Sequence, residues 1–236
     1  MALRRVVLLD ALGTLVELER PAPRLVAELR ARGVRVGEEQ AAAALGEEIA
    51  YYRANHDLAA DAASLTRLRD RCAEVLRAGL ERAGAGAAVR ALAPGDLRAA
   101  LLAALRFAPF GDVPAALAEL RAAGHRLVVV SNWDVSLHEM LRTTGLDGLV
   151  DGAISSAEAG TRKPDRAIFE RALALAGATV DAAPALHVGD SLELDVAGAL
   201  GAGLGAVLVA RAGAPRDVPD GVPVLTSLDG LAALAA

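Results

Sequence analysis

Short runs of aliphatic residues recur along the chain, separated by longer stretches of mixed polarity. Such runs are typical of strands that are buried on both faces of a parallel sheet. Strong runs occupy residues 4–9, 126–130, 185–188 and 206–209, and weaker runs occupy residues 150–154 and 222–225.

Between these runs, apolar residues recur at the spacing of an amphipathic helix. The helices that this spacing predicts cover residues 113–123, 135–144, 165–176 and 193–202. Strand and helix therefore alternate from about residue 110 onward. This alternation predicts an α/β fold with an open, Rossmann-like parallel sheet and right-handed crossovers.

The stretch of residues 16–108 has a different pattern. Its leucines recur at helical spacing with Arg and Glu between them, and it contains no good strand. We therefore expect a core of residues 1–15 and 109–236 that carries an inserted, all-helical domain of residues 16–108. The proline-containing segments 21–23 and 109–111 are predicted hinges near its two ends.

Composition narrows the class of protein. The 236 residues include 25 Lys plus Arg and 30 Asp plus Glu, and 54% of them are hydrophobic. These values indicate a globular chain of net charge −5, which excludes a disordered protein and a nucleic-acid binder with a strongly basic surface. Asp10 interrupts the apolar stretch near the start of the sequence, so we do not expect an export signal. No run reaches the roughly 20 apolar residues of a membrane helix. We expect a cytoplasmic protein that does not bind membranes.

Polar residues follow four of the expected strands. In an open α/β sheet, ligands bind beyond the carboxyl ends of the strands, so we expect these side chains to meet there. They are Asp10 after residues 4–9, Ser131 and Asn132 after residues 126–130, Lys163 after residues 150–154, and Asp190 with Asp195 after residues 185–188.

This set of side chains is typical of phosphate chemistry on a hard cation. Mg²⁺ takes oxygen ligands, usually one or two carboxylates together with substrate phosphate, and Asp10 and Asp190 could supply the carboxylates. Lys163, the only lysine in the sequence, would offset negative charge on the attacked group. Backbone N–H groups in the turn at Gly13 and Thr14 would bind phosphate oxygens. The best available nucleophile is a carboxylate.

The order and spacing of the segments 10–15, 131–134, 160–165 and 187–195 resemble those of the haloacid dehalogenase (HAD) superfamily, and the helical insertion resembles the cap of that family. The resemblance implies a hydrolase that closes its cap over a small-molecule substrate, which we expect to be phosphorylated. It implies the following roles: Asp10 as covalent nucleophile, Ser131 and Lys163 as ligands of the transferred group, Asp190 as metal ligand and Asp195 as its support.

One position departs from the phosphatases of this family. They have a second aspartate two residues after the nucleophile, and its carbonyl binds the metal while its side chain protonates the leaving group. This chain has Leu12 there. Because leucine keeps the carbonyl, we expect a Mg²⁺ site formed by Asp10, the Leu12 carbonyl and Asp190, with Asp195 beside it. Loss of the acid should slow the release of poor leaving groups by roughly 10²–10⁴-fold.

Three functions remain open on the sequence. Leu12 favours the 2-haloacid dehalogenases of the family, which also lack this acid. Asp190 favours a Mg²⁺-dependent phosphatase, because the dehalogenases have serine there and use no metal. A carboxylate beside Asp10 would repel an anionic substrate unless a cation lay between them. The preferred hypothesis is hydrolysis of a small phosphate ester. The alternatives are metal-free 2-haloacid dehalogenation and non-catalytic binding of a phosphorylated ligand.

Each residue taken singly also has a structural interpretation. Asp190 could cap a helix, Ser131 could lie in a turn and Lys163 could lie on the surface. Their placement at successive strand ends in one order argues against coincidence. His187, close to the end of a buried strand, is interpreted as a hydrogen-bonded core histidine.

Overall fold

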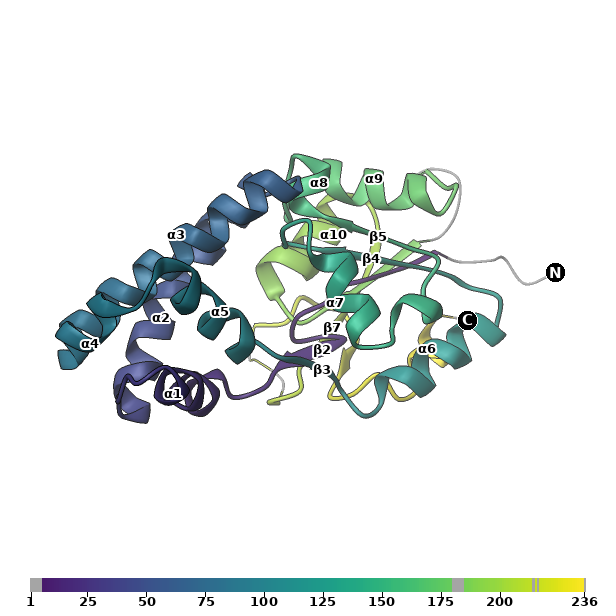
Figure 1. Cartoon of the computed structure of the whole chain (residues 1–236). Helices are drawn as coiled ribbons and strands as arrows, with labels where there is room; N and C mark the ends of the chain where they lie inside the picture. The colour runs from purple at the N-terminus through teal and green to yellow at the C-terminus, as the bar shows by residue number, and fades with distance from the viewer. Residues whose placement is uncertain (1–5, 180–184, 214, 216, 236) are drawn as a thin grey trace. The chain divides into compact units, whose positions relative to one another are not determined.

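The computed structural model describes residues 6–179, 185–213, 215 and 217–235 (Figure 1). The chain divides into two compact units. The core unit comprises Met1–Glu17 and Ala108–Ala236, and the helical unit comprises Leu18–Phe107. The sequence analysis placed the corresponding boundaries after residues 15 and 108.

A six-stranded parallel sheet forms the centre of the core unit, in the order β5-β4-β1-β6-β7-β8. The predicted α/β class and parallel sheet are confirmed. The strands are β1 (Val6–Leu9), β4 (Arg126–Ser131), β5 (Gly152–Ser155), β6 (Ala185–Gly189), β7 (Gly205–Val209) and β8 (Val224–Leu225).

The register brings the ends of the central strands together. Leu9, the last residue of β1, pairs with Val129 of β4 on one side and with Val188 of β6 on the other. The Asp10 amide continues this ladder by donating a hydrogen bond to the Val188 carbonyl at 2.9 Å. Residues that follow β1, β4 and β6 therefore leave the sheet at one edge.

Helices cover both faces of this sheet, which explains why its strands are predominantly aliphatic. Leu8 and Val130 pack with Ile168 and Phe169 of α9 on one face. The alternate strand residues lie on the other face, against α6 and α7. The helices of the core unit are α6 (Val113–Ala122), α7 (Leu137–Thr143), α8 (Ser156–Ala159), α9 (Arg166–Leu175), α10 (Gly198–Gly201) and α11 (Leu231–Leu234).

The helix predicted over residues 193–202 is present, but it is divided in two. It begins as a π-helical segment, Leu192–Ala197, which leads into α10. Ser191 caps this segment, since its hydroxyl accepts a hydrogen bond from the Leu194 amide at 3.1 Å. π-Helical turns are rare and often occur at functional sites, and this one carries Asp195.

The helical unit has an apolar centre of its own. Leucines that recur at helical spacing, among them Leu25, Leu76 and Leu101, are fully or almost fully buried in it. In the part of the chain that the structure describes, no helix is long and apolar enough to cross a membrane. The α-helices of this unit are α1 (Pro21–Ala31), α2 (Glu38–Asn55), α3 (Ala62–Leu80), α4 (Gly86–Ala91) and α5 (Pro94–Ala104).

Two expectations for residues 16–108 are wrong. This stretch does contain strands, because β2 (Val16–Leu18) pairs with β3 (Phe107–Pro109) where the chain passes between the units. Strands of three residues are too short to produce a visible alternation. The predicted hinge at residues 21–23 is the first turn of α1. Proline suits that turn, because the first N–H groups of a helix have no partner within it.

Candidate active site

Asp10 lies at the carboxyl edge of the sheet and is 6% exposed. Its Oδ1 atom accepts two hydrogen bonds, from the Ser131 hydroxyl at 3.1 Å and from the Lys163 ammonium at 2.6 Å. Ser131 ends β4, and Lys163 lies in the loop after α8. The structure thus brings together three of the side chains that the sequence placed at separate strand ends.

Lys163 is almost completely buried between two carboxylates. Its ammonium donates to Asp10 Oδ1 and to Asp195 Oδ1, each at 2.6 Å. Asn132 holds the backbone of this loop, because its Oδ1 accepts from the Lys163 amide at 2.8 Å and its Nδ2 donates to the Lys163 carbonyl at 3.1 Å. Asn132 was expected to bind substrate; in this structure both polar atoms of its amide group bond to the backbone of Lys163.

Asp195 is 2% exposed and accepts hydrogen bonds on both carboxylate oxygens. Besides Lys163, His187 Nε2 lies 2.8 Å from Oδ1, and the Ser191 amide donates to Oδ2 at 2.9 Å. A Cβ atom on Gly189 would lie 2.2 Å from the Asp195 Cγ atom, so only glycine fits there. The interpretation of His187 as a hydrogen-bonded core residue is confirmed.

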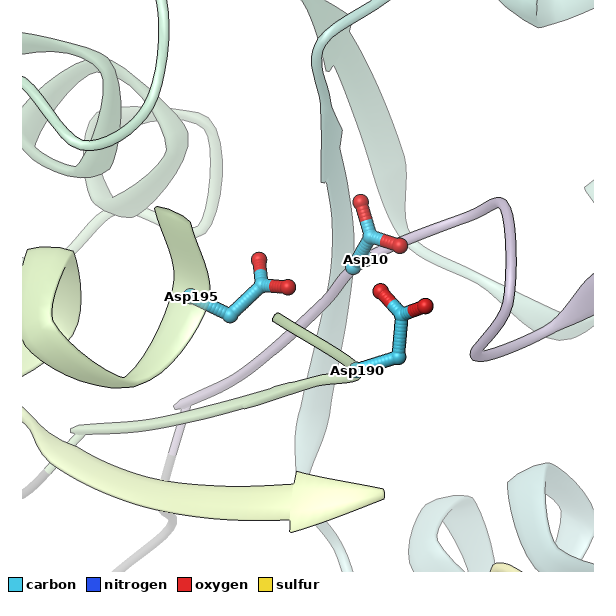
Figure 2. Close-up of side chains that lie close together, drawn as sticks. All are labelled: Asp10, Asp190 and Asp195. Carbon is cyan, nitrogen blue, oxygen red and sulfur yellow. The ribbon is translucent and has the colours of Figure 1, made fainter. Parts of the chain in front are cut away.

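Asp190 follows β6 and is exposed. Figure 2 shows its carboxylate beside that of Asp10, with Asp195 directed toward both from the neighbouring helical turn. Gly13, which has φ of +89°, passes so close that a Cβ atom there would lie 2.1 Å from Asp190 Oδ2. The Gly13 amide, which was expected to bind phosphate, donates to the Val16 carbonyl at 2.8 Å in this structure.

Thr14 was expected to offer its backbone N–H group to phosphate; its side chain is fully buried. Its carbonyl accepts a hydrogen bond from Arg211 Nη2 at 2.7 Å, which anchors the loop that follows β1. The sequence analysis missed Arg211. Because Arg211 comes two residues after the end of β7, the rule that selected the other strand-end residues could have found it. Leu12, two residues after Asp10, is 37% exposed.

Burial and charge act in opposite directions on these groups. Burial of Asp10, with the Asp195 and Asp190 carboxylates nearby, raises its pKa to about 6 although Lys163 lowers it. Burial would raise the pKa of Asp195, but the charges and hydrogen bonds of Lys163 and His187 outweigh burial and hold that pKa well below its usual range. Burial disfavours the Lys163 ammonium, yet the two carboxylates raise its pKa above the usual range.

The three aspartates fit a small, hard cation. Each has a carboxylate oxygen that lies within 4.8 Å of an oxygen of the other two. Oxygen ligands at this spacing suit Mg²⁺. Burial is the main cause of the raised pKa of Asp10, and a cation between Asp10 and Asp190 would offset the repulsion that adds to it. Asp195 already holds Lys163, His187 and the Ser191 amide, so Asp10 and Asp190 are the better ligands.

Comparison with known proteins gives a family match over most of the chain. The model of the haloacid dehalogenase-like hydrolases matches residues 4–203. That range contains Asp10, Ser131, Lys163, Asp190 and Asp195.

Individual relatives match over shorter segments. The haloacid dehalogenase-like hydrolase domain-containing protein 3 of Bos taurus is 41% identical over 111 residues, which cover 46% of this chain and 43% of that protein. A glyceraldehyde 3-phosphate phosphatase of Methanothermobacter thermautotrophicus is 34% identical over 102 residues, which cover 43% of this chain and 44% of that protein. The matched segments thus span less than half the length of these relatives.

A solved structure matches over nearly the whole chain. The 2-haloacid dehalogenase of Pseudomonas syringae pv. Tomato DC3000 has a TM-score of 0.65 and 24% identity, and the match covers 98% of each chain. At this identity the likeness shows the fold alone.

Proposed function

Because the chain belongs to the haloacid dehalogenase-like hydrolases, we propose that it hydrolyses a small phosphate ester with Mg²⁺ through a covalent intermediate on Asp10. The carboxylate of Asp190 beside that of Asp10 is the observation that carries this proposal. An anionic substrate that approaches two neighbouring carboxylates is repelled, and a divalent cation held by Asp10 and Asp190 would remove this repulsion.

The proposed reaction uses Asp10 as nucleophile. A carboxylate oxygen of Asp10 bonds to phosphorus while the bond from phosphorus to the ester oxygen breaks. The ester oxygen leaves with the bonding electron pair as an alkoxide or aryloxide, and a basic alkoxide takes its proton from water. Water then attacks the phosphorus of the aspartyl-phosphate, which frees Asp10 and yields inorganic phosphate. Ser131 and Lys163 both reach Asp10 Oδ1. These contacts support their proposed role as ligands of the phosphoryl group that this carboxylate attacks, whose charge the ammonium would stabilise.

The remaining site residues have supporting roles. Asp10, Asp190 and the Leu12 carbonyl are the proposed ligands of Mg²⁺, which supplies positive charge against the phosphate. Asp195 supports the site by holding the Lys163 ammonium. Because Gly13 has no side chain, the backbone can pass close beside Asp190. The phosphatase name of the Methanothermobacter relative is consistent with this proposal.

Metal-free 2-haloacid dehalogenation is the second candidate, and Leu12 is the observation that favours it. Displacement of a halide needs no general acid, so a leucine at this position would cost such a reaction nothing. In that reaction Asp10 would bond to the carbon that carries the halogen, and the carbon–halogen bond would break. Asp190 opposes this candidate because, without a cation, it adds negative charge where a haloacid carboxylate must bind.

Substrate screening separates these functions. Phosphate esters and 2-haloacids are supplied to the protein with Mg²⁺ or with EDTA, and release of phosphate and halide is measured. The proposal predicts release of phosphate that stops in EDTA. Asp190→Asn should abolish this release and weaken Mg²⁺ binding in calorimetry, whereas Glu193→Gln, a control at an exposed position nearby, should change neither. Release of halide in EDTA at an undiminished rate would instead establish the dehalogenase.

A further inference from the structure

We infer that His187 is a positioning residue for the reaction: its imidazole fixes the Asp195 carboxylate, which in turn fixes the Lys163 ammonium against Asp10. This inference rests on the proposed function in assigning Asp10 and Lys163 to the chemistry. His187 would act on Lys163 only through Asp195. From the sequence it was interpreted only as a residue of the core.

His187 has a well-defined place in the sheet. It lies in β6, pairs with Leu8 of β1 and Ala206 of β7, and is 1% exposed. The edge of one aromatic ring meets the face of the other where Phe169 packs against His187, with ring centroids 5.1 Å apart and an interplanar angle of 77°. The imidazole is therefore held by packing, with its Nε2 atom 2.8 Å from Asp195 Oδ1.

The Asp195 carboxylate requires a hydrogen on the Nε2 atom of His187. A carboxylate only accepts hydrogen bonds, so Nε2 must carry the hydrogen that points at Asp195. The other nitrogen, Nδ1, is buried and has no hydrogen-bond partner among the described residues. A buried polar atom without a partner costs free energy, which an aliphatic residue in this strand would avoid. The bond to Asp195 is the contact that offsets this cost.

That bond matters because Asp195 holds the ammonium. Asp195 Oδ1 accepts from both His187 and Lys163, and the Ser191 amide holds Oδ2. Without the imidazole, the carboxylate loses one of the donors that set its rotation, and Lys163 loses a fixed anchor opposite Asp10. Misplacement of a catalytic group by about 1 Å can cost roughly 10²-fold in rate. The expected defect is in kcat, since the site keeps all its charges.

Three substitutions test the inference. Gln at position 187 retains an N–H group that can reach Asp195, whereas Leu and Met keep an apolar side chain and have no donor. We expect His187→Gln to keep kcat within about threefold, and His187→Leu and His187→Met to lower kcat about 10–100-fold with KM changed less than about threefold. Purely structural packing predicts the opposite order, because Leu and Met suit a buried strand better than Gln. Circular dichroism and thermal unfolding identify the folded variants. Two apolar variants are used so that one can be measured if the other does not fold.

A second measurement needs no turnover. Lys163 is the only lysine in the sequence, so reductive methylation of its side chain is read by mass spectrometry without interference from other lysines. Methylation should be slow in the wild type and in His187→Gln, and faster in the two apolar variants, because their ammonium is less firmly held.

The two readouts separate failure of this inference from failure of the proposed function. A wild type that hydrolyses no ester contradicts the proposed function, and the methylation rates still decide the role of His187. Wild-type kcat in a folded apolar variant would overturn the inference. An equal loss of kcat in all three variants, or unchanged reactivity of Lys163 in the apolar variants, would also overturn it.

Discussion

Single glycines decide how closely the backbone of the site can approach its carboxylates. Gly13 and Gly189 each lie where a Cβ atom would overlap an aspartate, Asp190 in one case and Asp195 in the other. Real Cβ atoms do not come this close to other atoms, so the backbone can pass here only without a side chain. These glycines therefore belong to the site as much as the carboxylates do.

Substitution of Gly13 by alanine should weaken the binding of metal as well as the stability of the fold. Gly13 and Gly33 both have positive φ, +89° and +81°, but a Cβ atom on Gly33 would meet nothing within 4 Å. Gly33→Ala should therefore lower the free energy of unfolding by only about 1 kcal/mol. Gly13→Ala should lower it further and displace Asp190, so that calorimetry detects weaker binding of Mg²⁺. Equal Mg²⁺ affinity in Gly13→Ala and the wild type would contradict this geometry.

Leu12 should make the enzyme selective for good leaving groups. An aryl phosphate such as p-nitrophenyl phosphate leaves as a stable anion and hardly needs a proton, whereas an alkyl phosphate leaves as a basic alkoxide and does. Leu12→Asp restores a carboxyl group at a position that is 37% exposed in the leucine form, so the new group keeps contact with water. We expect kcat/KM for an alkyl ester to rise about tenfold or more relative to that for the aryl ester.

The control for this comparison is the ratio of kcat/KM for the two substrates in the wild type, which should favour the aryl ester. A folded Leu12→Asp variant that changes both substrates equally would mean that Leu12 does not replace a missing acid. The proton for an alkyl leaving group would then come from another residue.

The sequence could predict which residues gather at the site, but not all of their partners. Asp10, Ser131 and Lys163 are found by the rule that ligands bind at the carboxyl ends of parallel strands. The same rule gave Asn132 a ligand's role, yet its amide is used by the backbone of Lys163. Which backbone group a polar side chain pairs with depends on the path of a loop, and hydrophobic spacing does not record that path.

Among the elements of the core unit, the loops after β1 and β7 are joined by one arginine. Arg211 donates to both carboxylate oxygens of Asp112, at 2.9 and 3.2 Å, and to the Thr14 carbonyl. Its guanidinium stacks on Phe110 at 3.6 Å from the ring centre. Asp112 also accepts from the Leu228 amide at 2.6 Å. Through this contact the start of α6 and the end of β7 hold the loop that follows Asp10.

Removal of this arginine should lower stability in a pH-dependent way. Burial would raise the pKa of Asp112, but hydrogen bonds from Arg211 and Leu228 outweigh burial and lower it from 3.8. A lowered pKa means that the pairing stabilises the fold above that value and is lost as pH falls through the folded-state pKa. Arg211→Met should therefore cost about 2 kcal/mol at pH 7, as for a partly buried, charge-assisted contact.

Urea unfolding at pH 7 and near pH 3 measures the difference in the free energy of unfolding between Arg211→Met and the wild type. This difference should be smaller at the lower pH. Arg166→Met is the matched control, because Arg166 pairs with Glu170 on an exposed helix surface and should cost less than about 0.5 kcal/mol. A difference for Arg211→Met that persists unchanged at low pH would contradict the role given to the ionised Asp112.

Elements were predictable to the extent that their pattern repeats. Long amphipathic helices such as α9 and buried strands such as β4 each contain several residues of one period, which is why their predicted ranges nearly match the structure. β2 and β3 contain three residues each, and their pairing depends on segments about ninety residues apart. Such pairing forms only in the tertiary structure, and no local hydrophobic period predicts it.

At the scale of the whole molecule, the change of hydrophobic period near residue 16 and its return near residue 110 mark the two units. Every residue of the proposed catalytic set belongs to the core unit, although Asp10 and Ser131 are about 120 residues apart in sequence. The helical unit between them forms its own apolar cluster. The proposed chemistry can therefore be tested in the full chain by substitutions in the core unit alone.

Replacement of Asp10 by asparagine tests the proposed chemistry most directly. Asparagine keeps the size of the side chain and removes the nucleophilic carboxylate, so with Mg²⁺ present Asp10→Asn should release no phosphate from p-nitrophenyl phosphate. Asp147→Asn, at an exposed position of the same unit, should remain fully active, and circular dichroism should show both variants folded. A folded Asp10→Asn variant that retained most of the wild-type rate of phosphate release would contradict catalysis through Asp10.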